Sequence, residues 1–245
     1  DGATSTTGAG SHVHNYSNLG STTLTYDLEL IAETPQGCRD TMIQTITVFP
    51  EVTATYTSDT AGCHPIIICF NNTSTNATMW NWDFGDGFVD VVEDPCHVFN
   101  NTSNQDTTFN VQLIASSVNG CADTATSQVF VFPVPQALFT ATPVTQTYPA
   151  TTVTLTNTSG GGSWNYDWDL GDGFDTTTFS PGTHTYSTWG TYDVELVVYS
   201  PYCSDTATQQ VTIIPPLPII EFYGSDSGCF PVTVQFIDSS QYVDT

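Results

Sequence analysis

The amino-acid sequence predicts an all-β protein built of tandem β-sandwich domains in an extended rod. Two observations lead to this prediction: a block of motifs that recurs with a fixed period, and short segments in which apolar and polar residues alternate. Cys38, Cys121 and Cys203 mark the period, which is 83 residues for the first interval and 82 for the second. A repeat of this length is a whole small domain rather than one turn of a solenoid.

Alternation is clearest in the segment that precedes each of these cysteines. Apolar residues occupy every second position in residues 26–32, 109–115 and 192–198. This is the pattern of a half-buried antiparallel strand. A second strand is expected after each cysteine, at residues 43–49, 127–132 and 209–214, and an earlier one at residues 66–70, 151–155 and 232–236. About seven short strands per repeat, separated by Gly, Asn and Asp turns, are typical of a β-sandwich.

Proline-containing connections at residues 49–50, 132–135 and 214–218 divide the chain into four predicted parts. Two are complete repeats, 51–133 and 134–215. Two are partial: 1–50 is the C-terminal part of a repeat, and 216–245 is the N-terminal part of another. Short proline-rich connections without Gly/Ser runs act as semi-rigid spacers. The sequence therefore predicts a stiff rod cut from a longer array, in which each repeat has its neighbours as partners.

The charge balance is strongly acidic, with 25 Asp and Glu residues, one Arg, and a formal net charge of −24. Such a surface repels nucleic acid and anionic lipid, so neither a nucleic acid nor a membrane is expected as a partner of this segment. Solubility and mutual repulsion on a crowded surface account for the charge, and capture of multivalent cations is the alternative. No stretch of about 20 apolar residues suggests a membrane span.

The seven cysteines are placed by their position in the repeat. Cys63 and Cys229 occupy an early position, and Cys38, Cys121 and Cys203 a late one, so the simplest bridge within a repeat is Cys63–Cys121. Cys69 and Cys96 occur only in the second repeat and are expected to pair there. The partners of Cys38 and Cys229 would lie outside the chain, and Cys203 is left without an assigned partner. Zinc sites need closely spaced ligand pairs, which are absent, so disulfides and an oxidising, extracellular compartment are predicted.

A six-residue signature follows the early strands. Trp82-Asp83-Phe84-Gly85-Asp86-Gly87 recurs as Trp168-Asp169-Leu170-Gly171-Asp172-Gly173, and Asp1-Gly2 matches its end. The glycines are expected to take positive φ in a tight turn, the aspartates to accept bonds from backbone amides, and the tryptophans to be buried. His14, His97 and His184 recur downstream, which favours a packing role over metal ligation.

This signature, the following His-x-Tyr and the segment Gly190-Thr191-Tyr192-Asp193-Val194-Glu195-Leu196 resemble the PKD (polycystic kidney disease) domain. The resemblance covers essentially the whole chain. It implies immunoglobulin-like β-sandwiches that serve as spacers or adhesive modules, without catalysis. The Gly-Cys-x-Asp-Thr element is similar to PKD arrays of giant surface proteins of Bacteroidota, including gliding adhesins. Asp-Thr steps resemble the O-glycosylation motif of that group and make four threonines candidate glycan sites: Thr41, Thr60, Thr124 and Thr206.

Enzymatic and metal-binding alternatives fit less well. A glycosidase needs two carboxyl groups on opposite sides of a cleft, which two aspartates three residues apart on a repeated turn do not provide. No Gly-x-Ser-x-Gly motif is present. No cofactor is expected, although calcium stays open because clustered carboxylates suit a hard cation.

The leading hypothesis is a non-catalytic structural or adhesive stalk of a large extracellular bacterial surface protein, which can assemble as a homo-oligomeric filament. The alternative is a carbohydrate- or protein-binding accessory module of a secreted hydrolase. In that case Trp164 and Trp189 are candidate sugar-stacking residues.

Overall fold

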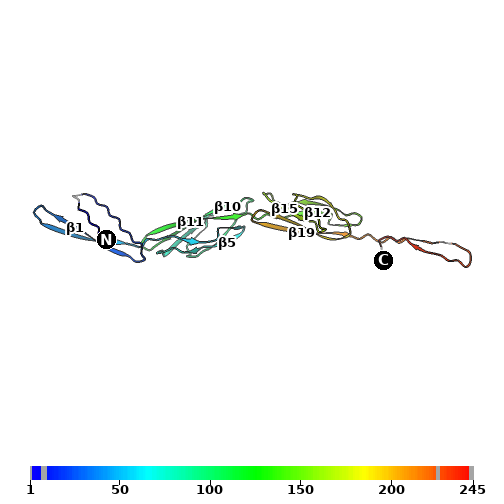
Figure 1. Cartoon of the computed structure of the whole chain (residues 1–245), viewed down its shortest axis with the longest axis horizontal. Helices are drawn as coiled ribbons and strands as arrows, with labels where there is room; N and C mark the ends of the chain where they lie inside the picture. Colours follow the sequence, from blue (N-terminus) through cyan, green and yellow to red (C-terminus); the bar gives the residue numbers. More distant parts are fainter. Residues whose placement is uncertain (1, 7–9, 225–226, 243–245) are drawn as a thin grey trace. The chain divides into compact units, whose positions relative to one another are not determined.

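The structure is a computed structural model that describes residues 2–6, 10–224 and 227–242 (Figure 1). Every regular element in this part of the chain is a β-strand, as the sequence predicts. The same residues include no helix long and apolar enough to cross a membrane. The chain divides into two compact units, residues 1–132 (unit 1) and 133–245 (unit 2). Asp1, the first residue of the partial signature, lies outside the described residues.

Unit 1 begins with a hairpin of β1 (Leu24–Glu33) and β2 (Arg39–Val48), which pair antiparallel from end to end. The apolar side chains of β1 are largely exposed: Leu28 is 49% and Leu30 66% exposed. The residues at the corresponding positions of the next repeat, Val111 and Leu113, are completely buried. The hairpin thus has the alternation of a sandwich strand pair but belongs to neither buried core of the structure.

The complete sandwich of unit 1 follows. Its strands are β3 (Tyr56–Thr57), β4 (Ala61–Cys63), β5 (Ile66–Cys69), β6 (Asn71–Asn72), β7 (Met79–Asp83), β8 (Val89–Asp90), β9 (Cys96–Phe99), β10 (Thr107–Ser116) and β11 (Ala122–Phe132). The larger sheet has the order β4-β11-β10-β7-β8, and the pairs β3-β6 and β5-β9 form the rest. All pairings are antiparallel except that of β4 with the end of β11.

The core of this sandwich comes from the alternation read in the sequence. On β10, Val111, Leu113 and Ala115 are completely buried while the residues between them are not. They pack in one cluster with Ile68 and Phe70 from the region of β5. Because successive side chains of a strand point to opposite faces, the period of two produces one apolar face per strand. Fully burying a valine, leucine, isoleucine or phenylalanine side chain contributes about 1.5–3 kcal/mol.

Unit 2 repeats this architecture. Its strands are β12 (Phe139–Thr142), β13 (Thr145–Thr147), β14 (Thr152–Asn157), β15 (Asn165–Asp169), β16 (Asp175–Thr176), β17 (Gly182–Thr185), β18 (Gly190–Tyr199), β19 (Ser204–Ile214), β20 (Phe222–Tyr223) and β21 (Ile237–Asp238). The sheet β13-β19-β18-β15-β16 has the order of the larger sheet of unit 1, and β12-β14-β17 forms the second layer. β20 and β21 form a separate two-stranded pair.

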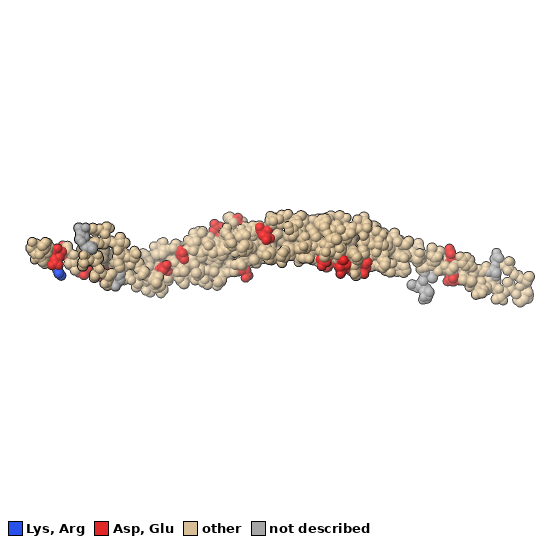
Figure 2. All heavy atoms as spheres, turned by 45° about the horizontal axis from the view of Figure 1, so that its top comes forward, with Lys and Arg blue, Asp and Glu red and all other residues tan. Residues whose placement is uncertain are grey.

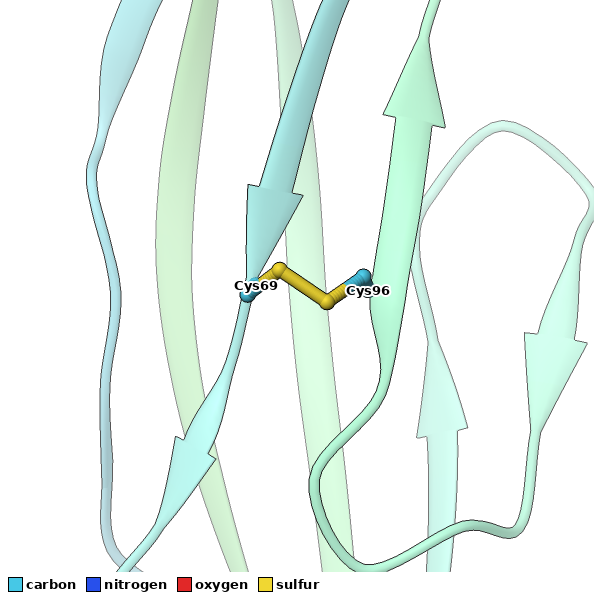
Figure 3. Close-up of a disulfide and its surroundings, with 2 residues drawn as sticks. All are labelled: Cys69 and Cys96. Carbon is cyan, nitrogen blue, oxygen red and sulfur yellow. A yellow bond between two sulfur atoms is a disulfide. The ribbon is translucent and has the colours of Figure 1, made fainter.

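The disulfides differ from the predicted framework. Cys69 and Cys96 are joined, with their Cα atoms 3.9 Å apart, and link β5 to β9 (Figure 3). Cys121, however, is a free thiol, so the predicted Cys63–Cys121 bridge is wrong. Cys63 and Cys203 are each disulfide-bonded, which removes the unexplained thiol at position 203.

Topology explains the error. Cys63 at the end of β4 lies beside Phe132 at the end of β11, whereas Cys121 directly precedes the start of β11. At about 3.3 Å per residue, the two ends of this strand are about 35 Å apart. A disulfide needs Cα atoms within about 7 Å. Cys38 and Cys229 are free and exposed.

Candidate functional site

The signature forms a tight turn between β7 and β8 in unit 1 and between β15 and β16 in unit 2. In unit 1, Asp83 Oδ1 accepts a hydrogen bond of 2.9 Å from the Gly85 amide, and Asp86 Oδ1 accepts one of 3.1 Å from the Phe88 amide. The Phe84 amide donates to the Phe88 carbonyl and closes the turn. Both aspartates therefore bind backbone amides of their own loop.

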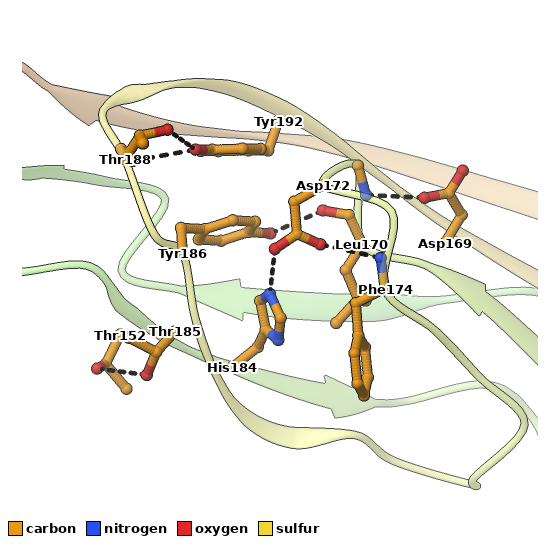
Figure 4. Close-up of polar contacts among 11 residues, drawn as sticks. Thr152, Asp169, Leu170, Asp172, Phe174, His184, Thr185, Tyr186, Thr188 and Tyr192 are labelled. Atoms are coloured by element: carbon orange, nitrogen blue, oxygen red, sulfur yellow. Dashed lines mark hydrogen bonds and ion pairs between the residues drawn. The ribbon is translucent and has the colours of Figure 1, made fainter.

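Unit 2 builds the same turn (Figure 4). Asp169 Oδ1 accepts from the Gly171 amide at 2.8 Å, and Asp172 Oδ1 accepts from the Phe174 amide at 3.2 Å. The Leu170 amide donates to the Phe174 carbonyl. Because two sequences that differ around the signature give the same set of bonds, the turn is a property of the motif.

The second oxygen of the later aspartate binds the recurring histidine. His97 Nε2 donates to Asp86 Oδ2 at 2.7 Å in unit 1, and His184 Nε2 donates to Asp172 Oδ2 at 2.8 Å in unit 2 (Figure 4). The histidines lie on β9 and β17, strands of the other layer. One carboxylate thus orders the turn and ties it to the facing layer. The sequence placed these histidines at one structural position but did not identify their partner.

The two glycines of the signature have different roles. Gly85 has φ +76° and a Cβ at this position would lie 2.5 Å from the carbonyl oxygen of Asn110. Gly171 repeats this, with φ +79° and a Cβ 2.7 Å from the carbonyl oxygen of Asp193. Gly87 and Gly173 also have positive φ, but a Cβ there would meet nothing within 4 Å. Only the first glycine of each turn is required both by the backbone conformation and by the space available.

The signature tryptophans are completely buried, and each binds the backbone of the segment that follows the turn. Trp82 Nε1 donates to the Val92 carbonyl, and Trp168 Nε1 donates to the Thr178 carbonyl, both at 3.0 Å. Each ring also packs edge-on against an aromatic ring of the same core: Tyr56 in unit 1, 4.9 Å between centroids, and Phe139 in unit 2, 5.1 Å. Each tryptophan therefore fixes the segment after the turn to the core.

Tyr186, the tyrosine of the His-x-Tyr motif in unit 2, is a buried phenol. Its hydroxyl donates to the Leu170 carbonyl at 3.0 Å, and its ring stacks on Tyr192 with 4.0 Å between centroids (Figure 4). Tyr192 in turn donates to the Thr188 carbonyl. Burial, assisted by the nearby Asp172 carboxylate and by Tyr192, raises the pKa of Tyr186 to about 12.

The aspartate of the late cysteine motif fixes the start of each sandwich. Asp123 Oδ2 accepts from the Ala54 amide at 2.9 Å, and Asp205 Oδ2 accepts from the Ala137 amide at 2.8 Å. The bond from Ala54, followed by one from Thr124, lowers the pKa of Asp123. All four candidate glycan sites are at least partly exposed to solvent: Thr41, Thr60, Thr124 and Thr206. Three of them occupy matching positions on the second strand of a hairpin.

The signature carboxylates are bound by groups of their own sandwich. Asp83 and Asp169 accept from loop amides, and Asp86 and Asp172 accept both from a loop amide and from a histidine. Within residues 2–6, 10–224 and 227–242 no three His, Cys, Asp or Glu side chains are grouped to hold a metal ion. A cluster of carboxylates is what the sequence left open for calcium, and the described residues contain no such group.

Trp164 and Trp189, the two tryptophans found in unit 2 without a counterpart in unit 1, differ in solvent exposure. Trp164 packs partly buried against the core and donates from Nε1 to the Gly160 carbonyl at 3.2 Å. Trp189 is 49% exposed and packs edge-on against Tyr148. Of the two predicted sugar-stacking candidates, Trp189 alone presents much of its ring to solvent.

A comparison with protein families agrees with the resemblance over one repeat. Residues 132–214 match the family described as PKD domain. No curated protein matches the chain.

Among solved structures, the PKD1 domain from Vibrio cholerae metalloprotease PrtV is 21% identical, with 34% of this chain and 98% of that chain covered and a TM-score of 0.29. The PKD1 domain of Vibrio anguillarum Epp is 21% identical, with 34% and 95% covered and a TM-score of 0.28. The fibronectin(III)-like modules of Clostridium thermocellum CbhA are 12% identical, with 67% and 94% covered and a TM-score of 0.30.

Proposed function

We propose that this chain is a segment of a non-catalytic structural or adhesive stalk in a large extracellular bacterial surface protein. The observation that carries the proposal is the signature turn, which is built twice with the same bonds. In both copies its carboxylates bind amides of the loop and a histidine of the facing layer. Repeated modules whose polar side chains form hydrogen bonds within the module fit a load-bearing or spacing role. PKD domains are in general non-catalytic modules of extracellular proteins.

Mechanical unfolding tests the load-bearing role. The chain is pulled by atomic force microscopy in reducing buffer, so that no disulfide limits extension. Each complete sandwich holds close to 80 residues, and at about 3.5 Å per extended residue it should release about 25 nm of chain. Two force peaks with this spacing are expected, and none in concentrated guanidinium chloride. Extension without force peaks in native buffer would show that the sandwiches do not bear load.

The stiffness of the connections and the cellular location need separate measurements. Small-angle X-ray scattering of the chain should give the profile of an elongated particle if the proline-containing connection at residues 132–135 acts as a spacer. A profile that requires an ensemble of bent conformations would contradict the rod. An antibody to the chain should label intact cells of the source organism; labelling only after lysis would contradict an extracellular stalk.

Glycans and self-assembly are further parts of this proposal. Thr41, Thr60, Thr124 and Thr206 are the proposed O-glycosylation sites, and glycans there would protect an exposed stalk. Mass mapping of the protein purified from its source should find hexose-containing modifications on these peptides. Assembly into a filament should appear as concentration-dependent growth in sedimentation velocity, and a constant monomer would exclude it.

An accessory binding module of a secreted hydrolase is the second candidate, favoured by the exposed ring of Trp189. Aromatic faces stack on sugars, so the chain should then be retained on insoluble polysaccharide. Trp189→Ala should abolish retention, and Trp164→Ala is the matched control because its ring is partly buried. No retention of the unsubstituted chain would reject this candidate.

A further inference from the structure

Unit 1 carries an apolar surface segment that its fold does not need. Residues 88–92, here called the apolar ribbon, run from the signature turn through β8. Four of the five side chains are apolar and largely exposed: Phe88 67%, Val89 67%, Val91 70% and Val92 55%. Scattered exposed apolar residues are normal on a protein surface, but a contiguous group of them marks an interaction site.

The matching segment of unit 2 shows that the apolar character is not structural. Strand register aligns Val89 with Asp175, and Asp90 with Thr176, because these residues face the same two signature positions. The residues that correspond to Val91 and Val92 are Thr177 and Thr178. Phe88 has an apolar counterpart in Phe174, which is 52% exposed, but the three valines have polar counterparts, and the same turn and the same tryptophan bond form there. The fold accepts aspartate at the first of these sites and threonine at the other two, so the valines are explained by something outside the sandwich.

The ribbon is held rigidly at its backbone. Asp90 Oδ1 accepts from the amides of both Val91 and Val92, at 2.6 and 3.0 Å, and the Val92 carbonyl accepts from Trp82. The Phe88 amide is bound by Asp86. With these amides occupied, the ribbon is a poor template for addition of a further strand, and contact through its side chains is what it offers. A surface fixed in advance loses little entropy when it binds.

A disulfide private to unit 1 secures the far end of this segment. Cys96 follows the ribbon by four residues and is bonded to Cys69 (Figure 3). At the same register positions unit 2 has Thr154 and Thr183, without a bridge. The unit with the apolar ribbon is therefore also the unit in which the ribbon's exit is covalently fixed.

Exposed apolar side chains also occur on β5 and β9. The ring of Phe88 lies 5.7 Å from the ring of His97 on β9. The next residue on β9, Val98, is paired with Ile67 of β5, and both side chains are exposed. Because successive side chains of a strand point to opposite faces, this pair lies on the outer face of its layer, whereas His97 faces the ribbon.

The charge around the ribbon selects the partner. Asp90, Glu93 and Asp94 lie in or directly after it, and the chain's one basic side chain, Arg39, is paired with Glu33 in the hairpin. Acidic side chains are spread along the surface with hardly any basic ones (Figure 2). A second copy carries the same charge of −24, which disfavours it as the occupant of this acidic face, so the proposed filament assembly would use another face. A partner with Lys or Arg beside its apolar side chains is attracted.

We propose that the apolar ribbon is a docking surface for a protein partner whose contact segment combines aliphatic or aromatic side chains with flanking Lys or Arg. This goes beyond the stalk proposal, because it assigns an adhesive face to one repeat and not to the next. A stalk without this face would still show the two force peaks, so the two proposals fail separately.

Fluorescence anisotropy with a defined probe tests the docking surface. The probe is a labelled 12-residue peptide of alternating Leu and Lys, and the control probe has Glu in place of Lys. The whole chain is compared with the triple variant Val89→Thr, Val91→Thr, Val92→Thr, which leaves the charge unchanged and resembles the segment that unit 2 already folds. The matched control variant is Val118→Thr, since Val118 is an equally exposed valine in the β10–β11 turn.

The expected result is binding of the Leu/Lys peptide that weakens at least tenfold in the triple variant and is unchanged in Val118→Thr. Binding should also weaken between 50 and 500 mM NaCl, because part of the attraction is between exposed charges. Equal binding of the Leu/Glu peptide, or equal affinity of the triple variant, would overturn the proposal. So would a dimer in sedimentation velocity that the triple variant abolishes, because the occupant would then be a second copy.

Discussion

Replacing Gly85 with alanine should destabilise the sandwich of unit 1 by about 2–4 kcal/mol, whereas Gly87→Ala should cost about 1 kcal/mol. Both glycines lie in the signature turn and both have positive φ, +76° and +93°. They differ in their surroundings. A Cβ at Gly85 would lie 2.5 Å from one backbone atom of Asn110 and 2.9 Å from another, and a Cβ at Gly87 would meet nothing within 4 Å.

The magnitudes follow from three contributions. Left-handed backbone costs alanine about 1–2 kcal/mol relative to glycine. The smaller conformational freedom of alanine in the unfolded chain returns about 0.4–1 kcal/mol. Gly87→Ala has only these two contributions. At Gly85 the new methyl must push against the backbone of β10, and overpacking of this kind adds about 1–3 kcal/mol.

Hydrogen exchange measured by mass spectrometry is the suitable assay, because its peptides separate the two units of the intact chain. Peptides from β7 and β10 should lose protection strongly in Gly85→Ala and slightly in Gly87→Ala, while those from β15 and β18 stay unchanged as an internal reference. Gly171→Ala should reverse the pattern. Equal losses for Gly85→Ala and Gly87→Ala would refute the argument that the contact with Asn110 distinguishes the two positions.

Three further predictions concern single side chains. Tyr186 has a pKa raised to about 12 in the folded state, so its contribution to the stability of unit 2 is complete below about pH 10 and is lost as the pH rises through 12. In Tyr186→Phe the midpoint pH of alkaline unfolding of unit 2 should therefore be higher. An unchanged midpoint would contradict this. In denaturant unfolding, His97→Ala should cost about 2–3 kcal/mol and His184→Ala about 1–2 kcal/mol. Both histidines lose the bond to the turn aspartate, but only the His97 ring is also stacked face to face on an aromatic ring, that of Phe84, with 4.1 Å between centroids. Equal costs would show that the stacking contributes nothing. Alkylation without reductant should modify Cys121 and leave Cys63 unmodified; protection of Cys121 would restore the bridge predicted from sequence.

Much of the fold follows from local patterns along the chain. The alternation before Cys121 predicts a half-buried strand, and β10 buries Val111, Leu113 and Ala115 on one face. Side-chain direction in a strand depends only on the local backbone, so a period of two is readable from sequence. Positive φ at Gly85 and Gly87 could be anticipated for the same reason, since turn conformation is a local property.

Long-range contacts were not readable in this way. The sequence placed His97 and Asp86 in register without indicating that they bind each other across the layers. It also paired Cys63 with Cys121, whereas the parallel placement of β4 beside the end of β11 puts these residues at opposite ends of a strand. Trp164, a candidate sugar-stacking residue under the binding-module alternative, packs partly buried against the core.

By itself, then, the sequence determined the all-β class, most of the strands, the repeated turn and the acidic surface. Each of these depends on residue type and on spacing within a few positions. The strand expected at residues 232–236 is absent, and the short strand there is β21, Ile237–Asp238. The tertiary structure alone decided which cysteines meet, why Gly85 tolerates no side chain, and that four of the five side chains at residues 88–92 are apolar and exposed. These properties depend on which distant segments lie beside a residue, and a pattern along one strand does not contain that information.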